Sequence, residues 1–161
     1  MHLPFIAKVF KGHNVTLVPI LVGNLTKAKE KEYGKILAPF FEDRETLFIV
    51  SSDFCHWGDD FDYMPHNHKE FGNQIWKSIE ALDSQAMEHI EKQSRTDFYD
   101  YCEKSGNTIC GRHPIGVLLG AIEAHKKEPL ETKFTHYSQS EKVTSADQSS
   151  VSYAASITVI S

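Results

Sequence analysis

Two short segments carry most of the side chains in this chain that could do chemistry. The first, residues 51–58, reads SSDFCHWG and follows an apolar run. The second, residues 107–114, reads NTICGRHP and leads into a helix-like stretch. Together they supply cysteine, histidine, aspartate and arginine at the ends of apolar elements. Because sites in open α/β sheets gather at the carboxyl ends of strands, we expect the two segments to meet in one cavity.

In the first segment, His56 is a candidate proton-transfer group or metal ligand, because imidazole exchanges protons close to neutral pH. Asp53 could orient an imidazole nitrogen, which makes it a second candidate catalytic residue. Cys55 and Trp57 flank the histidine and are expected to line the same pocket. The alternative is a buried loop in which the histidine and the aspartate only satisfy backbone groups, and this segment alone does not decide between the two.

In the second segment, Cys110 lies just before a predicted helix, and both the helix N-terminus and Arg112 favour a thiolate. The thiol is therefore a candidate metal ligand, redox thiol or nucleophile. Arg112 could clamp an anionic group. His113 is held extended before a proline and is expected to cap the helix or to line the pocket. The alternative is a buried, protonated cysteine whose neighbouring arginine forms a salt bridge.

A count of donors limits the kinds of metal site that the chain can build. Cys110 and His56 give two or three good ligands, whereas a closed structural zinc site needs four. An iron site of the facial-triad type needs three, usually two histidines and a carboxylate. No acidic residue adjoins the second segment, so further ligands would have to come from elsewhere. His66 and His68 lie on a polar stretch and are expected to be solvated.

The composition is that of an ordinary globular protein, with 161 residues of which 40% are hydrophobic and 24% charged. The net charge of −5 and the lack of a Lys/Arg run argue against a nucleic-acid partner. No apolar stretch approaches the roughly 18 residues of a membrane helix, and the first residues lack a secretory pattern. Three irregularly spaced cysteines favour a reducing compartment, cytoplasmic or nuclear. Cys102 is expected to be a packing residue.

Hydrophobic periodicity predicts the elements that would hold these segments. Short apolar runs at 15–22 and 47–50 predict buried strands, and with a helix at 26–41 between them they predict a parallel pair with a right-handed crossover. Thr26 and Ser94 are predicted N-caps. Further helices are predicted at 2–11, 70–82, 84–92, 95–104 and 114–124, and further strands at 132–138 and 151–160. The predicted fold class is α/β, a mixed sheet flanked by helices, in a single domain over residues 1–161.

Several stretches resemble the Memo family, whose name stands for mediator of ErbB receptor-driven cell motility. The similar stretches are the first residues MHLP, residues 51–58, residues 107–119 (NTICGRHPIGVLL) and residues 147–155 (DQSSVSYAA). The two long motifs are specific, and the similarity runs over essentially the whole chain. The chain is similar to the C-terminal portion of a Memo protein, and the N-terminal half of such a protein is absent from it.

The resemblance implies a fold and a cellular role. Memo proteins are similar in fold to class III non-haem iron dioxygenases, the extradiol ring-cleaving type, of which this chain would be a partial copy. The resemblance also implies a signalling or scaffold role in cell motility and in cytoskeletal or redox signalling. Signalling proteins or phosphopeptides would be the partners, and family members are linked to reactive oxygen and to the handling of iron or copper.

The resemblance also assigns roles to residues. The family pocket uses two histidines from the N-terminal half and one cysteine, which matches Cys110, while the histidine that matches the dioxygenase general base is His56. The resemblance therefore implies a vestigial metal pocket that is incomplete in this chain, with iron or copper held in the full-length protein. A thiol in place of a carboxylate favours a signalling protein over a ring-cleaving enzyme. An iron- or copper-dependent redox enzyme is the alternative.

Overall fold

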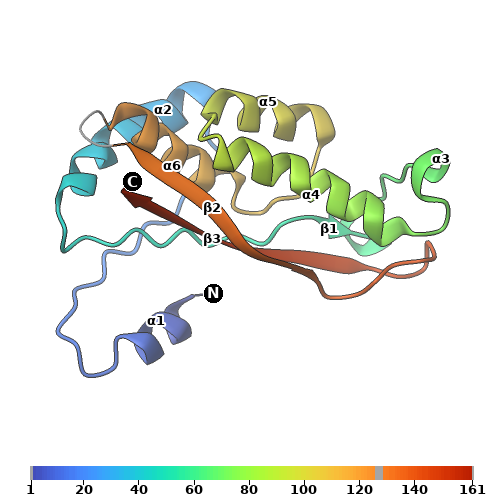
Figure 1. The fold of residues 1–161 in the computed structure, drawn as a ribbon, viewed down its shortest axis with the longest axis horizontal. Helices are drawn as coiled ribbons and strands as arrows, with labels where there is room; N and C mark the ends of the chain where they lie inside the picture. Colours follow the sequence, from blue (N-terminus) through green and yellow to red (C-terminus); the bar gives the residue numbers. More distant parts are fainter. Residues whose placement is uncertain (1, 126–128, 161) are drawn as a thin grey trace.

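Four helices lie over one face of a long antiparallel hairpin, and a short N-terminal helix lies on the other side (Figure 1). This computed structural model describes residues 2–125 and 129–160. The elements are α1 (Leu3–Val9), α2 (Lys27–Leu37), η1 (Ala38–Glu42), β1 (His56–Trp57), η2 (Asp59–Phe61), α3 (His68–Phe71), α4 (Ile75–Glu91), α5 (Arg95–Ser105), α6 (Arg112–Ala124), β2 (Leu130–Gln139) and β3 (Ser150–Ile160).

The sheet has the order β1-β3-β2, and both of its strand pairs are antiparallel. β2 and β3 pair from Leu130 opposite Ile160 to Gln139 opposite Ser152, with one register irregularity along β2. The predicted strands at 132–138 and 151–160 are therefore confirmed. β1 adds only two residues to the other edge of β3, and backbone bonds with Ser152 extend this contact to Phe54 and Cys55.

The predicted parallel pair is wrong. Within the described residues, 15–22 and 47–50 carry neither helix nor strand, so the sheet contains no crossover. Both runs keep large apolar side chains in solvent, and Leu21 is 100% exposed. A buried parallel strand needs a hydrogen-bonded neighbour and cover on both faces. The described part of the chain supplies neither to these runs, so apolar composition does not make them strands.

The helices follow the sequence pattern more closely. Thr26 and Ser94 each accept a hydrogen bond at 3.4 Å from the backbone N–H three residues further on, so both predicted N-caps are confirmed. α6 begins two residues earlier than predicted, at Arg112. The helices predicted at 70–82 and 84–92 are joined in one helix, α4, because Asp83 continues the helix with its side chain buried. The start of the first prediction is wrong, since α4 begins at Ile75, and the residues before it include the separate short helix α3 and a turn.

Two clusters of buried side chains form the core. The first lies between α4, α5, α6 and the sheet and includes Phe54, Phe98, Leu119 and, as predicted, Cys102. The second comprises Cys55, Trp57, Ile75, Ile79 and Val143. The consecutive residues Phe54 and Cys55 face different clusters, so the segment that leads to β1 is fixed from both sides.

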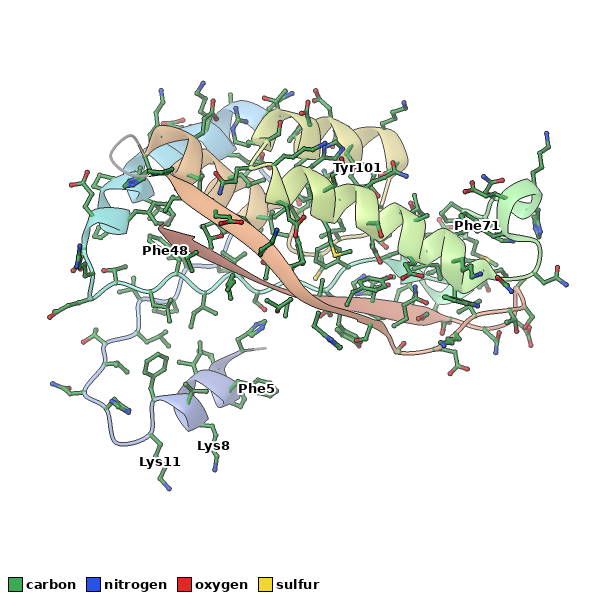
Figure 2. All side chains as sticks on the ribbon, in the orientation of Figure 1. Phe5, Lys8, Lys11, Phe48, Phe71 and Tyr101 are labelled. Carbon is green, nitrogen blue, oxygen red and sulfur yellow. The ribbon has the colours of Figure 1, made fainter. Side chains whose placement is uncertain are left out.

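α2 and α6 pack with their backbones in close contact. A Cβ atom added to Gly34 would lie 2.4 Å from the carbonyl carbon of Gly120, so no larger residue fits at Gly34 without moving a helix. This contact fixes α6, and with it the second chemistry-bearing segment, against the body of the protein. α1, in contrast, lies apart from the helical layer, and Phe5 points away from the core (Figure 2). No described helix has the length and apolar content needed to cross a membrane.

Candidate metal centre

Asp53, His56 and Cys110 come together where the two segments meet. One ligand atom from each residue lies within 4.8 Å of the other two. His56 Nε2 is 4.0 Å from Asp53 Oδ2, and the Asp53 N–H donates to Cys110 Sγ at 3.2 Å. Two of these residues come from the first segment and the third lies more than fifty positions further on. The fold thus assembles a nitrogen, an oxygen and a sulfur donor at one point.

Thr108 fixes the orientation of His56 through three hydrogen bonds. The His56 backbone N–H donates to Thr108 Oγ1 at 2.7 Å, and that hydroxyl donates to the His56 carbonyl at 2.9 Å. His56 Nδ1 lies 3.0 Å from the Thr108 carbonyl oxygen. Because a carbonyl only accepts, Nδ1 carries the proton, and in the neutral ring Nε2 keeps a free lone pair. An imidazole that ligates a metal is typically held in this way.

Gly111 and Ser52 place Cys110 beside the first segment. The Gly111 N–H donates to Ser52 Oγ at 2.9 Å, and this hydroxyl donates to the Asp53 carbonyl at 2.7 Å. A Cβ atom at Gly111 would lie 2.3 Å from the Ser52 Cβ, so the two backbones can approach only because this residue is glycine. Gly111 is also the N-cap of α6, which puts the Cys110 sulfur near the positive end of that helix.

The site lies at the surface of the protein. Cys110 is exposed, whereas the side chains of Asp53 and His56 are about one-fifth exposed. The Asp53 N–H and the start of α6 both direct positive partial charge towards the sulfur. An ion could therefore reach the three donors directly from solvent.

The three donors fit a transition-metal ion. Metal–sulfur and metal–nitrogen bonds of about 2.3 and 2.0 Å put tetrahedral ligands about 3.5 Å apart, so the side chains would have to close by about 1 Å. Thiolate, imidazole and carboxylate together suit borderline ions such as zinc, iron and copper. Three protein donors also leave a coordination position open. Asp53, whose expected role was to orient a ring, is placed where it could serve as the third ligand.

Cys55 and Trp57, the flanking residues expected to line the pocket, do not belong to this group of donors. Both are buried in the second core cluster. Burial raises the pKa of the Cys55 thiol far above its usual range, and the nearby Asp83 carboxylate raises it further. The Trp57 indole N–H donates to the Pro65 carbonyl at 3.0 Å. In the structure these two residues pack in the core and so fix the first segment in place.

Arg112 and His113 are each bound to a carboxylate of another helix, in α5 and α2 respectively. Arg112 Nη1 donates to Glu103 Oε1 at 2.9 Å, and His113 Nδ1 lies 2.9 Å from Glu30 Oε1. Burial raises the pKa of Glu30, and His113, Arg95 and Arg112 oppose that rise. The salt bridge considered for Arg112 is therefore present. An anion clamp at Arg112 would need the Glu103 pair to open.

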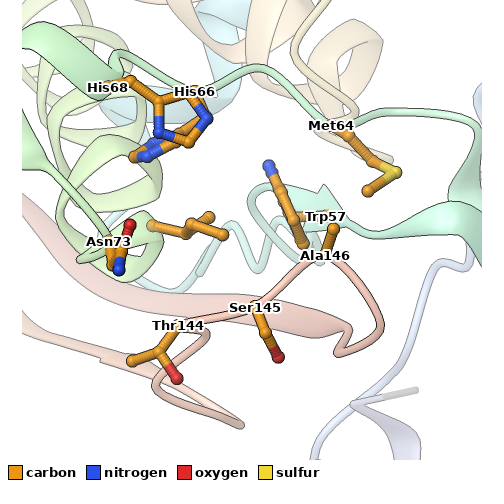
Figure 3. A pocket seen from close by; sticks show the side chains of 9 residues that line it. Trp57, Met64, His66, His68, Asn73, Thr144, Ser145 and Ala146 are labelled. Atoms are coloured by element: carbon orange, nitrogen blue, oxygen red, sulfur yellow. The ribbon is translucent and has the colours of Figure 1, made fainter.

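A separate cavity of about 320 Å³ lies on the other side of β1 (Figure 3). Its lining comprises Trp57, Met64, His66, His68, Asn73, Ile75, Thr144, Ser145 and Ala146. His66 is half-buried rather than solvated, because Nδ1 is bonded to Ser78 Oγ at 2.8 Å and Nε2 to the Gly72 carbonyl at 2.6 Å. Its two ring nitrogens are therefore both engaged, and the histidine pair does not form a metal site.

A comparison with known families and proteins matches nearly the whole chain. The profile of the family described as Memo-like protein matches residues 1–157. The chain belongs to the Memo-like protein family. Protein MEMO1 of Rattus norvegicus is 45% identical over 159 residues, which cover 96% of this chain and 53% of the relative. For Protein MEMO1 of Xenopus laevis the identity is 44% over 164 residues, covering 99% and 54%.

A relative from a third organism gives the same result. The Protein memo-1 homolog of Caenorhabditis elegans is 44% identical over 160 residues, which cover 98% of this chain and 45% of the relative. This Memo-family chain thus spans about half the length of the curated relatives that it matches. The resemblance found in the two motifs is confirmed, and the fold is an α/β arrangement of helices on a small antiparallel sheet.

Sequence reasoning missed the residues that support the site in this Memo-family chain. Thr108 and Ser52 lie inside the two quoted segments, yet nothing in their spacing shows that they bond across to the other segment. Asp83 contacts both segments from α4, at a position where the sequence pattern predicts a gap between two helices. The one available signal was that polar groups in buried loops need partners.

Proposed function

We propose that this Memo-family protein binds a transition-metal ion, iron or copper, through Asp53, His56 and Cys110. The observation that supports this most strongly is the free Nε2 of His56, which points towards a carboxylate and a thiol while Nδ1 is held by a backbone carbonyl. An open coordination position would let the ion take up a further ligand. The protein would act in signalling or as a scaffold, with signalling proteins or phosphopeptides as partners.

Two features favour a signalling role over ring cleavage. The proposed set keeps the Asp53 carboxylate but has the Cys110 thiolate where a facial-triad iron site has a second histidine, which changes the charge and the donor character that an oxygen-activating site relies on. The site is also exposed at Cys110, and the cavity of about 320 Å³ is lined by other residues, on the far side of β1. Small-molecule substrates are usually enclosed over most of their surface. The three free cysteines suit a reducing compartment such as the cytoplasm or nucleus.

The proposal can be tested by anaerobic titration of the 161-residue chain with Co²⁺. Ligation by Cys110 predicts a sulfur-to-cobalt charge-transfer band in the near ultraviolet that saturates at one ion per chain. Cys110→Ser should abolish the band and His56→Gln should weaken binding, whereas Cys102→Ala, a change at a buried cysteine in the first core cluster, should leave both intact. An equally strong band in Cys110→Ser would contradict the proposal.

A second candidate function is an iron- or copper-dependent redox enzyme. The observation in its favour is that three donors leave a position open, where a bound ion would supply one-electron chemistry. Asp53 would hold the ion through one carboxylate oxygen, and its second oxygen could move a proton at that position. Sustained oxygen consumption by the iron-loaded chain with ascorbate as reductant, lost in Asp53→Asn with the ion still bound, would support an enzyme. Binding without turnover would support the signalling role.

A further inference from the structure

The carboxylate of Asp83 bridges the two segments that form the metal centre. Asp83 lies in the middle of α4 and is 0% exposed. Its Oδ1 accepts one hydrogen bond from the Cys55 backbone N–H and another from Asn107 Nδ2, both at 3.1 Å. Cys55 directly precedes His56, and Asn107 directly precedes Thr108. Asp83 Oδ1 thus binds both segments. In each segment the bound residue directly precedes a member of the hydrogen-bonded pair His56 and Thr108, which sets the orientation of the imidazole.

The other side of the carboxylate is held just as firmly. The Tyr137 hydroxyl on β2 lies 2.9 Å from Asp83 Oδ2 and 3.2 Å from Ser152 Oγ on β3. Asn107 Nδ2 also donates to the Tyr101 hydroxyl at 3.1 Å, while Asn107 Oδ1 is buried without a partner among the described residues. The orientation of the Asn107 amide therefore depends on its Nδ2 partners. Asp83 joins helix, sheet and both segments in a single network.

We infer that Asp83 is a positioning residue for the metal centre, one that sets the separation of His56 and Cys110 by holding both segments from beneath. This inference rests on the proposed function. A buried carboxylate is costly unless it is fully hydrogen-bonded, and this one is bonded to the two loops that need a fixed spacing. Residues behind a metal site commonly change its affinity by about 10–100-fold when they are replaced.

The experiment compares four variants of the full chain. Asp83→Ala removes the bridge, whereas Asp83→Asn keeps an Oδ1 that can still accept both N–H groups. Tyr137→Phe removes the Oδ2 partner, together with the hydroxyl's contacts to Ser152 and Gln139, and leaves the Oδ1 bridge in place. Ile90→Ala leaves a cavity on the same helix without touching a hydrogen bond of the network. The readouts are Co²⁺ affinity, amide exchange at Cys55 measured by NMR, and the rate at which iodoacetamide alkylates Cys110.

Asp83→Ala should lower Co²⁺ affinity by at least about tenfold and speed exchange and alkylation, while the other three variants stay close to the parent. A folded Asp83→Ala with the parent's affinity and exchange rate would overturn the inference. Should Asp83→Ala fail to fold, Asn107→Ala takes its place, because it cuts the same bridge from the other segment, and unchanged affinity would again overturn it. If the parent chain binds no Co²⁺, the proposed function fails, and Cys55 exchange in Asp83→Ala alone decides whether Asp83 holds the loops.

Discussion

Replacing Thr108 by valine isolates the contact that orients His56. Valine keeps the shape of threonine but has no hydroxyl, so the His56 N–H loses its acceptor at 2.7 Å and the His56 carbonyl loses its donor at 2.9 Å. The third contact, from the imidazole to the Thr108 carbonyl, involves the backbone and survives the substitution in principle. This contact between His56 Nδ1 and the Thr108 carbonyl would then be the one remaining hydrogen bond between the two residues.

The cost of this change follows from the two lost hydrogen bonds. A hydrogen bond contributes about 1 kcal/mol net, and an N–H left without a partner costs about 1–3 kcal/mol when it is buried. Thr108 and His56 are half-buried, so we take the lower part of that range and expect a loss of about 2 kcal/mol in the free energy of unfolding. For a chain of this size, 2 kcal/mol corresponds to a fall in Tm of about 4–8 °C.

The assay is thermal unfolding followed by circular dichroism, with Thr108→Ser as the matched control. Serine keeps the hydroxyl and loses one methyl group, so its Tm should stay within about 2 °C of the parent. Co²⁺ affinity should fall about tenfold in Thr108→Val and change little in Thr108→Ser. If valine and serine have the same effect on Tm and on affinity, the hydroxyl does not orient the imidazole and the reasoning is refuted.

Three further predictions concern the rest of the molecule. Gly34→Ala should lower the free energy of unfolding by about 1–3 kcal/mol, because its Cβ would press on Gly120, whereas Gly23→Ala, which meets open space, should change it little; equal effects in urea denaturation would contradict the helix contact. Burial raises the pKa of Asp83 above its ordinary 3.8, so above about pH 4 the folded state keeps a proton that the unfolded state has lost, and the free energy of unfolding falls as pH rises. Asp83→Asn should flatten this dependence of the unfolding free energy on pH, measured by urea titrations between pH 4 and 7. An unchanged dependence would contradict the prediction. Leu21→Ser should reduce binding of the dye ANS while shifting the unfolding free energy by less than about 0.5 kcal/mol, and a large loss of stability would show that Leu21 is packed.

Local signals in the sequence predict the helices and the hairpin. The starts of α2 and α5 follow from Thr26 and Ser94, because an N-cap depends only on residues three positions away. The alternation at 132–138 that predicts β2 likewise reflects more covered side chains that alternate with exposed ones over most of that strand. In both cases the information that specifies the element lies inside the element.

The failures have a common physical cause. The apolar runs at 15–22 and 47–50 indicate burial, but a strand also needs an adjacent strand, which no local pattern reveals. The break expected at Asp83 has the same origin: a charged residue that interrupts an apolar stripe suggests a helix end, unless distant loops supply donors for it. Partners far along the chain decide both cases.

The candidate site could be predicted only in part. The residue types and their places after apolar elements indicate Asp53, His56 and Cys110, but they indicate Cys55 and His113 equally, and the structure places these two elsewhere. That Asp53 faces the sulfur, and that Thr108 leaves His56 Nε2 free, depends on hydrogen bonds across more than fifty residues of sequence. Such bonds follow from the fold and not from spacing.

The central claim, that one thiolate, one imidazole and one carboxylate converge on a metal ion, is tested most directly by the zinc-edge X-ray absorption spectrum of the chain loaded with one equivalent of Zn²⁺. Zn²⁺ serves as a probe without redox chemistry. Ligation by Cys110, His56 and Asp53 predicts a single sulfur at about 2.3 Å and nitrogen or oxygen ligands at about 2.0–2.2 Å. A first shell of nitrogen and oxygen alone, or a spectrum that Cys110→Ser leaves unchanged, would contradict it.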